Sequence, residues 1–227
     1  MNMDKSGSLY IVSTPIGNLK DITLRALEIL KYADFIVCED TRVTIKLLNR
    51  YGIKKPLISF HSKSKDTVLK KISDLVLSGG NIALVSDSGT PVISDPGAKL
   101  IQSLIDLGTR VVPIPGPSSV HTALMASGIP LSEYTFIGFL SNKTSRRRKT
   151  LEKLKNLKTT FVFFESPYRI LSFLEDALTI FGSVRGCVAK EMTKKFEKYY
   201  RGDISEILRM LQDDGVKGEY TLVIDNR

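Results

Sequence analysis

The first half of the chain alternates short, unbroken apolar runs with stretches of helical periodicity. The runs that we interpret as strands are Leu9–Ser13, Phe35–Cys38, Leu57–Phe60, Ile82–Val85 and Arg110–Ile114. Between them, Ile22–Tyr32 follows a possible helix cap at Asp21, and apolar residues recur at helical spacing from Val68 to Val76. Strands that are apolar along their whole length are typical of a parallel sheet with helices on both faces. The pattern therefore predicts βαβ architecture.

The pattern changes after a proline-rich segment, Pro113–Pro117, which we expect to be a linker. The strands expected beyond it are Tyr134–Leu140, Thr160–Phe164, Gly186–Lys190, Phe196–Arg201 and Tyr220–Ile224. Two of them are separated only by Glu191–Lys195, which is a hairpin-length connection. Asp203 and Glu206 have the spacing of a capping box at the start of the last helix. We therefore expect two α/β domains, residues 1–116 with a mainly parallel sheet and residues 117–227 with a mixed sheet.

Most of the positive charge lies in one short segment. Lys and Arg outnumber Asp and Glu by 33 to 24, and residues 141–158 carry eight of these basic residues against Glu152 alone. A solvated helix face is one interpretation. Consecutive, uncompensated guanidinium groups favour the other, which is contact with a phosphate backbone. The residues expected to bind RNA are Lys143, Arg146, Arg147, Arg148 and Lys149.

Several classes of protein are disfavoured. Cys38 and Cys187 each lie in an apolar run, so buried thiols are expected, and with only two histidines no zinc-type ligand set can be assembled. No apolar run approaches the roughly 18 residues of a transmembrane helix, and no signal peptide is recognised, so we expect a cytoplasmic protein. Neither the dinucleotide glycine fingerprint nor a phosphate-binding loop occurs. No metal and no phosphate-anchored nucleotide is therefore expected.

Polar bends follow four of the strands of the first half. They are Ser13–Asn18, Glu39–Arg42, Ser86–Pro91 and Pro115–Ser119. Each alone has an alternative interpretation as ordinary turn chemistry. Parallel α/β sheets bind ligands beyond the carboxyl ends of their strands, so the four bends together predict a ligand site at one sheet edge.

These bends, with three further motifs, resemble a known family. The motifs are Pro15–Leu19, Glu39–Arg42, Ser86–Pro91, Ser94–Gly97, Pro115–Ser119, Phe163–Arg169 and Ala189–Lys195. Together they resemble the tetrapyrrole-methylase superfamily and, more narrowly, its ribosomal RNA branch, small-subunit rRNA methyltransferase I. The resemblance implies two α/β domains with S-adenosylmethionine bound in the cleft between them, and a homodimer. It also implies methylation of a cytidine ribose 2′-hydroxyl in the decoding region of small-subunit ribosomal RNA.

By motif position, the resemblance also implies which residues contact the cofactor. They are Ile16, Val85, Ser86, Asp87, Thr90, Ser118 and Ser119, with Glu165 and Met192 from the second domain. Asp87 has the chemistry to pair with the cofactor's ammonium group or to accept hydrogen bonds from ribose hydroxyls. Its alternative role is to cap the following turn.

A ribose hydroxyl is a poor nucleophile until its proton leaves, so a base or a cation beside it would help. The candidates are Glu39, Asp40, Arg42, Glu165, Arg169, Lys190 and Glu191. For Glu39 and Asp40, a structural ion pair with Arg42 is an equally good explanation. The sequence alone does not choose among these residues.

Two other functions remain as alternatives. One is a tetrapyrrole ring methyltransferase, which the basic segment disfavours. The other is a non-catalytic RNA-binding ribosome assembly factor, which the intact polar bends disfavour.

Overall fold

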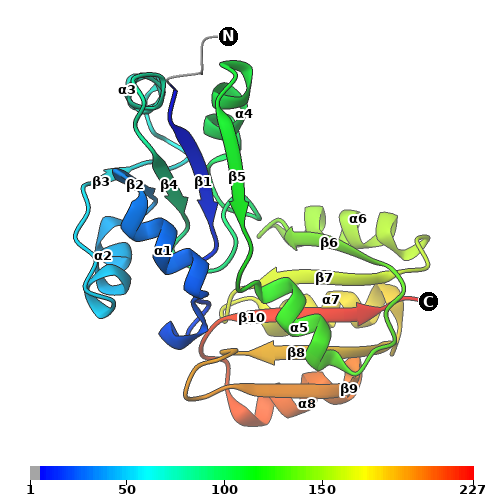
Figure 1. Ribbon diagram of the computed structural model, residues 1–227. Coiled ribbons are helices and arrows are strands. Elements are labelled where there is room, and N and C mark those ends of the chain that lie inside the picture. The colour runs from blue at the N-terminus through cyan, green and yellow to red at the C-terminus, as the bar shows by residue number, and fades with distance from the viewer. Residues whose placement is uncertain (1–5) are drawn as a thin grey trace. The chain divides into compact units, whose positions relative to one another are not determined.

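The chain divides into two compact units, each built around its own sheet (Figure 1). The computed structural model describes residues 6–227. The first unit ends at Ser118 and the second comprises Ser119–Arg227. The division lies two residues after Gly116, where the sequence places the end of the first domain.

The first unit is a parallel α/β sheet. Its strands are β1 (Ser8–Val12), β2 (Phe35–Cys38), β3 (Leu57–Ser59), β4 (Ile82–Val85) and β5 (Arg110–Ile114), in the order β3-β2-β4-β1-β5. Every strand pair is parallel. Its helices are η1 (Leu19–Asp21), α1 (Leu24–Tyr32), α2 (Thr41–Arg50), α3 (Asp66–Leu77) and α4 (Ala98–Asp106). The expected parallel sheet is confirmed.

Helices cover both faces of this sheet, which explains why its strands are apolar throughout. Alternate residues of β2 belong to different cores: Ile36 packs with α1 and α2, whereas Val37 packs with α3 and α4. Successive side chains of a strand point to opposite faces, so a strand between two helix layers needs apolar residues at every position. Each face of the sheet therefore has its own apolar core.

The second unit has a mixed sheet. Its strands are β6 (Tyr134–Phe139), β7 (Thr160–Glu165), β8 (Arg185–Lys190), β9 (Lys198–Asp203) and β10 (Tyr220–Asp225), in the order β6-β7-β10-β8-β9. Only β6 and β7 pair in parallel. Its helices are α5 (Ser119–Ser127), α6 (Thr144–Lys155), α7 (Ile170–Phe181) and α8 (Ile204–Asp214). The expected hairpin of β8 and β9 and the capping box of Asp203 and Glu206 are both confirmed.

Several expected boundaries differ from the structure by one or two residues. Thr23 rather than Asp21 caps α1, because its side chain accepts a hydrogen bond from the backbone N–H of Ala26, while Asp21 ends the preceding turn η1. β3 ends at Ser59, one residue early. β9 begins at Lys198 rather than Phe196, because the hairpin connection extends through Glu197 and leaves Phe196 70% exposed.

The second unit buries an ion pair beneath α6. The side chain of Arg147 is 2% exposed and that of Asp176 on α7 is 3% exposed; Arg147 Nη2 lies 2.5 Å from Asp176 Oδ2. Arg148 Nε donates to the other oxygen, Oδ1, at 2.6 Å. Arg147 also donates to the carbonyl of Ser172 at 3.3 Å. Both carboxylate oxygens are thereby paired, as a buried charge requires.

Removing one partner of this pair should destabilise the second unit strongly. Asp176→Ala leaves a buried guanidinium without a counter-charge, which costs about 3–5 kcal/mol of unfolding free energy. Urea denaturation followed by circular dichroism measures the loss. The matched control is Asp66→Ala, which removes an ion pair to Lys99 between exposed side chains and should change stability little. Equal effects of the two substitutions would contradict the structural role of the buried pair.

No helix among residues 6–227 has both the length and the apolar character needed to cross a membrane.

Candidate active site

The carboxyl ends of the parallel strands bring the four polar bends of the first unit to one edge of its sheet. The bends follow β1, β2, β4 and β5, which are neighbours in the sheet. Because parallel strands all end at the same edge, residues from distant parts of the sequence meet there. The expected ligand-binding edge thus has the geometry that the strand pattern predicts.

Backbone hydrogen bonds fasten the bends after β1 and β4 to each other. Thr14 N–H donates to the carbonyl of Gly89 at 2.8 Å, and Gly89 N–H donates back to Thr14 at 3.1 Å. The hydroxyl of Thr90 donates to the carbonyl of Pro117 at 3.1 Å, which ties in the bend after β5. The hydroxyl of Ser86 donates to the carbonyl of Gly89 at 3.1 Å. These short polar residues therefore set the shape of the edge.

The residues that follow the bend after β4 adopt an unfavourable backbone conformation. Val92 has φ of 75° and Ser94 has φ of 64°. A positive φ is uncommon for residues with a Cβ and is a genuine outlier for a β-branched side chain. Gly89, at φ of 79°, lies so close to the first bend that a Cβ there would be 3.3 Å from Ile16 Cγ2. Strain of this kind persists only where the surrounding structure imposes it, and it clusters at functional sites.

Three carboxylates influence one another at this edge, one from the segment after β2 and two from the segment after β4. Burial, followed by the negative charges of Glu39 and Asp87, raises the pKa of Asp95 to about 6. The pKa of Glu39 is also raised, first by burial and then by Asp87. Asp87 Oδ1 accepts a hydrogen bond from the backbone N–H of Asp40 at 3.0 Å, while Oδ2 has no hydrogen-bond partner in residues 6–227. The electrostatic potential at this edge is therefore negative, which suits a cationic ligand.

Asp40 and Arg42 are occupied with each other. Asp40 caps α2 by accepting from the backbone N–H of Arg42 at 2.8 Å, and its Oδ2 lies 2.6 Å from Arg42 Nη2. Hydrogen bonds from Arg42 lower the pKa of Asp40 to about 2. A carboxylate with so low a pKa is a weak base. The structure thus supplies the ion pair that was the alternative interpretation for Asp40, whereas Glu39 lies outside it.

The second unit presents its own candidates at the ends of β7 and β8. Glu165 ends β7 and its side chain is 0% exposed; Oε1 lies 2.6 Å from Arg169 Nη2 and accepts from the N–H of Ser166 at 2.8 Å. Its other oxygen, Oε2, is buried and has no hydrogen-bond partner in the described chain. Buried carboxylate oxygens are rarely left unsatisfied, and each such atom calls for a ligand, a water or a functional role.

Lys190 and Glu191 are held by the protein itself. Lys190 Nζ lies 3.3 Å from Asp214 Oδ2 and donates to the carbonyl of Gly215 at 3.1 Å. Glu191 Oε1 accepts from Lys194 Nζ at 3.0 Å and from the backbone N–H of Glu219 at 2.9 Å. These contacts give both residues a structural role. Met192, the neighbouring residue implied by the resemblance to contact the cofactor, is buried.

The remaining residues that the resemblance implies in cofactor binding lie in the first unit, except for Ser119. Ile16, Val85 and Ser86 are buried, and Thr90 is half-buried in the first unit. Ser118 ends that unit, and Ser119 begins α5 in the second.

The prediction of an uncompensated basic segment is wrong for two of its residues. Arg147 is buried against Asp176 and cannot reach a polyanion, and Arg148 shares the same carboxylate. Asp176 lies on α7, far away in sequence, so the charge pattern of α6 alone could not reveal it. Lys143, Arg146 and Lys149 are exposed. Only these three, with the half-exposed side chain of Arg148, remain as candidates for an RNA contact.

Asp95 is the residue that the sequence interpretation missed. It lies in Ser94–Gly97, one of the motifs that carry the resemblance, but no spacing in the sequence indicates that it approaches Glu39. The proximity arises because β2 and β4 are neighbours in the sheet.

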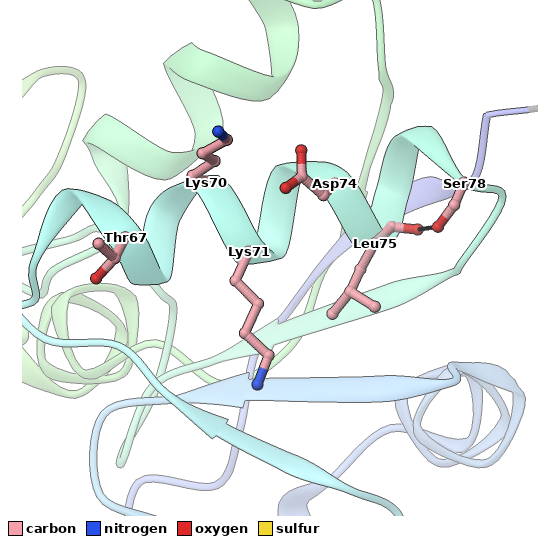
Figure 2. A pocket seen from close by; sticks show the side chains of 6 residues that line it. All are labelled: Thr67, Lys70, Lys71, Asp74, Leu75 and Ser78. Carbon is pink, nitrogen blue, oxygen red and sulfur yellow. Dashed lines mark hydrogen bonds between the residues drawn. The ribbon is translucent and has the colours of Figure 1, made fainter.

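A hollow on the outer surface of α3 is not part of this site. Its lining residues come from that helix and its C-cap residue, Ser78, and Figure 2 shows the side chains of Lys70 and Lys71 on opposite sides of the helix. Among residues 6–227 no group of three or more His, Cys, Asp or Glu side chains could hold a metal ion. Cys38 and Cys187 are free thiols and are buried, as expected.

Two methyltransferases are among the solved structures with the same fold. Cobalt precorrin-4 methyltransferase, a cobalamin biosynthetic enzyme, has a TM-score of 0.71 at 20% identity, over 96% of this chain and 94% of the other. The methyltransferase CobJ has a TM-score of 0.72 at 18% identity, over 97% and 95%. At these identities the likeness shows the fold alone, which is that of this class of methyltransferases.

The sequence comparisons narrow the class. Residues 8–208 match the Tetrapyrrole (Corrin/Porphyrin) Methylases. Ribosomal RNA small subunit methyltransferase I of Halalkalibacterium halodurans is 45% identical over 98% of this chain and 77% of its own length. The protein of that name from Thermotoga maritima is 45% identical over 97% and 99%. The chain therefore belongs to the tetrapyrrole methylase family and, within it, to the ribosomal RNA small subunit methyltransferase I family. The expected resemblance is confirmed.

The pKa of Asp95 predicts how stability depends on pH. Because its folded pKa of about 6 exceeds its ordinary value of 3.8, the folded state holds the proton more tightly than the unfolded state. The stability that this proton contributes is present below about pH 4 and is lost as the pH rises through about 6. The unfolding free energy of wild type, relative to Asp95→Asn, should therefore fall across that range and then level off.

Urea denaturation of both proteins from pH 4 to pH 7.5 measures this difference. Glu39→Gln should make the fall smaller, since the charge of Glu39 contributes to the raised pKa of Asp95. Parallel curves for wild type and Asp95→Asn would show that Asp95 titrates as an ordinary surface carboxylate.

Proposed function

We propose that this protein transfers a methyl group from S-adenosylmethionine to the ribose 2′-hydroxyl of a cytidine in the decoding region of small-subunit ribosomal RNA. Family membership supports the reaction class. The observation that carries the assignment of the donor is the carboxylate cluster of Glu39, Asp87 and Asp95, which suits a cationic ligand rather than a phosphate.

The residues at the sheet edge fit the chemistry of this cofactor. S-adenosylmethionine supplies an activated methyl group on a sulfonium centre and also carries an ammonium group, so carboxylates complement it. Asp87, with Oδ2 unpartnered, is the residue that we assign to the ammonium group or to the ribose hydroxyls. The residues proposed to hold the cofactor are Ile16, Val85, Ser86, Asp87, Thr90, Ser118, Ser119, Glu165 and Met192.

Ser86 and Thr90 contribute to the site by forming hydrogen bonds with backbone carbonyls of the bends. Their hydroxyls are committed to the carbonyls of Gly89 and Pro117, so they preorganise the bends instead of pointing at the ligand. Holding two reactants in the reactive geometry can lower an activation barrier by roughly 7–11 kcal/mol. Rigid bends that position the cofactor would therefore accelerate methyl transfer.

Two of the candidate bases retain a carboxylate oxygen that the protein does not occupy. These are Glu39, whose side chain forms no ion pair within residues 6–227, and Glu165, whose Oε2 is buried and unpartnered. We propose that one of them accepts the hydroxyl proton as the oxygen attacks the methyl carbon. Glu39 has the raised pKa that favours a base, whereas Arg169 holds Glu165 in place as an oriented acceptor.

The RNA is proposed to contact the exposed cations of α6 and of the residue before it. Lys143, Arg146 and Lys149 lie at the start of this helix and are exposed. Their placement supports a phosphate contact. The homodimer implied by the family resemblance is part of the same proposal, and sedimentation velocity tests it.

The function is tested by methyl transfer to RNA. With tritiated S-adenosylmethionine, wild-type protein should label unmethylated small ribosomal subunits or their RNA, and mass mapping should place the label on a cytidine ribose. A porphyrinoid serves as the alternative acceptor. Glu39→Gln or Glu165→Gln should lower the single-turnover rate by about 10²- to 10⁴-fold if that residue is the base. Labelling of the porphyrinoid alone, or of neither acceptor, would overturn the proposal.

A separate prediction concerns the charge of Asp87. Asp87→Asn keeps the shape of the side chain but removes a charged hydrogen-bond acceptor, so S-adenosylmethionine should bind about 10- to 150-fold more weakly. The exposed neighbour provides the control, since Ser88→Ala should bind as wild type does. Isothermal titration calorimetry measures both. If the affinity of Asp87→Asn for S-adenosylmethionine were unchanged, the role of Asp87 would be purely structural, namely to accept the hydrogen bond from the backbone N–H of Asp40.

A further inference from the structure

The second unit contains a hollow of about 580 Å³ at the connection between β8 and β9. Lys190, Tyr220 and Lys198 are register partners on β8, β10 and β9, so the β8–β9 connection and the segment before β10 lie at one end of the sheet. The residues lining the hollow are Lys190, Glu191, Lys195, Phe196, Glu197, Lys198, Asp214, Lys217 and Gly218.

The carboxylates of this hollow are already satisfied by the protein. Asp214 accepts from Lys198 Nζ at 2.8 Å, from Lys190 Nζ and from the hydroxyl of Tyr200, and these hydrogen bonds lower the pKa of Asp214. Glu197 accepts from the backbone N–H of Thr193. Glu191 is held by Lys194, as described above. No carboxylate of the hollow therefore needs a cationic ligand.

The shape of the hollow is also fixed. Glu191 has φ of 51°, and its side chain packs so closely on Gly218 that a Cβ there would lie 2.5 Å from Glu191 Cγ. Gly218 itself has φ of 102°, which strongly favours glycine. The two segments that line the hollow are thus held together by side-chain packing and by the hydrogen bonds of Glu191 with Glu219.

Two cations of the hollow form no ion pair within residues 6–227, and one of them, Lys195, lies over the exposed ring of Phe196. Lys195 and Lys217 are exposed and form no ion pair with any residue of the described chain. Phe196 is 70% exposed, and Lys195 Nζ lies 5.4 Å from its ring centroid. Cations beside an exposed aromatic ring are the usual elements of single-stranded nucleic acid binding, where the ring stacks on a base and the cations contact phosphates.

We infer that this hollow binds an unpaired nucleotide of the RNA substrate, with the base on Phe196 and the adjoining phosphates at Lys195 and Lys217. The inference rests on the proposed function and adds a second RNA contact beyond the start of α6. A protein partner is the less suitable occupant, because lysine is depleted from protein interfaces and here supplies four of the nine lining residues.

The hollow on α3 provides the matched control. It has a similar volume, about 540 Å³, and two exposed lysines, Lys70 and Lys71, but its lining contains no aromatic residue (Figure 2). Lys70→Ala/Lys71→Ala therefore removes the same charge as Lys195→Ala/Lys217→Ala without touching the proposed nucleotide site.

The experiment measures binding of an unmethylated decoding-region RNA fragment by fluorescence anisotropy at several salt concentrations. Lys195→Ala/Lys217→Ala should weaken binding and reduce the slope of log affinity against log salt by about 0.7 for each lysine. Phe196→Leu should weaken binding by about five- to 150-fold at an unchanged slope, and Phe196→Tyr should restore it. Lys70→Ala/Lys71→Ala should bind as wild type does.

Each failure has a distinct signature. If wild type binds and methylates RNA but the hollow variants do so equally well, the nucleotide site is wrong and the proposed function stands. If the variants lose affinity for S-adenosylmethionine in the same proportion, the residues act through the cofactor and the inference is overturned. If they change only the oligomeric state, the hollow is a protein interface. If wild type itself neither binds nor methylates RNA, the proposed function fails.

Discussion

The mutual hydrogen bonds of Thr14 and Gly89 are the interaction on which the candidate site depends. They join the bends after β1 and β4, the two strands at the centre of the first sheet. Thr90 then extends the connection to Pro117 after β5. The segment that follows the bend after β4 has positive φ at Val92 and Ser94, a strained conformation that the surrounding structure imposes. The parallel sheet thus provides a rigid edge, and small hydroxyl residues maintain its shape.

Compensation of charge inside the protein determines which charged residues are available to a ligand. Asp176 pairs with both Arg147 and Arg148, Arg42 pairs with Asp40, and two lysines pair with Asp214. The groups left without an opposite charge within residues 6–227 are carboxylates at the candidate site of the first unit, and they are lysines and Arg146 at the start of α6 and in the hollow of the second unit. A cationic donor suits the former and a polyanionic acceptor suits the latter. The charges left at these sites therefore agree with the two reactants of the proposed reaction.

Local patterns predicted most of the fold because both sheets are specified by short-range signals. Apolar strands, the linker prolines and the capping box of Asp203 all act within a few residues, and the parallel first sheet, the β8–β9 hairpin and the α8 cap followed from them. The errors arose where a distant residue decides the outcome. Arg147 appeared to be a surface cation because Asp176 lies 29 residues away in sequence. Asp95 was missed because its neighbour Glu39 follows a different strand, β2, whereas Asp95 follows β4. Residue spacing carries no information about such pairs.

The clustering of like charges at the first sheet edge has a consequence for turnover in the proposed reaction. Glu39, Asp87 and Asp95 repel one another, and this repulsion contributes to the raised pKa of Asp95. A bound cation relieves the repulsion, so the cluster favours a positively charged ligand over a neutral one of the same shape. Methyl transfer removes the sulfonium charge and leaves a neutral thioether. The electrostatic contribution to binding is therefore smaller for the product than for the donor, and the same carboxylates that favour donor binding also favour product release.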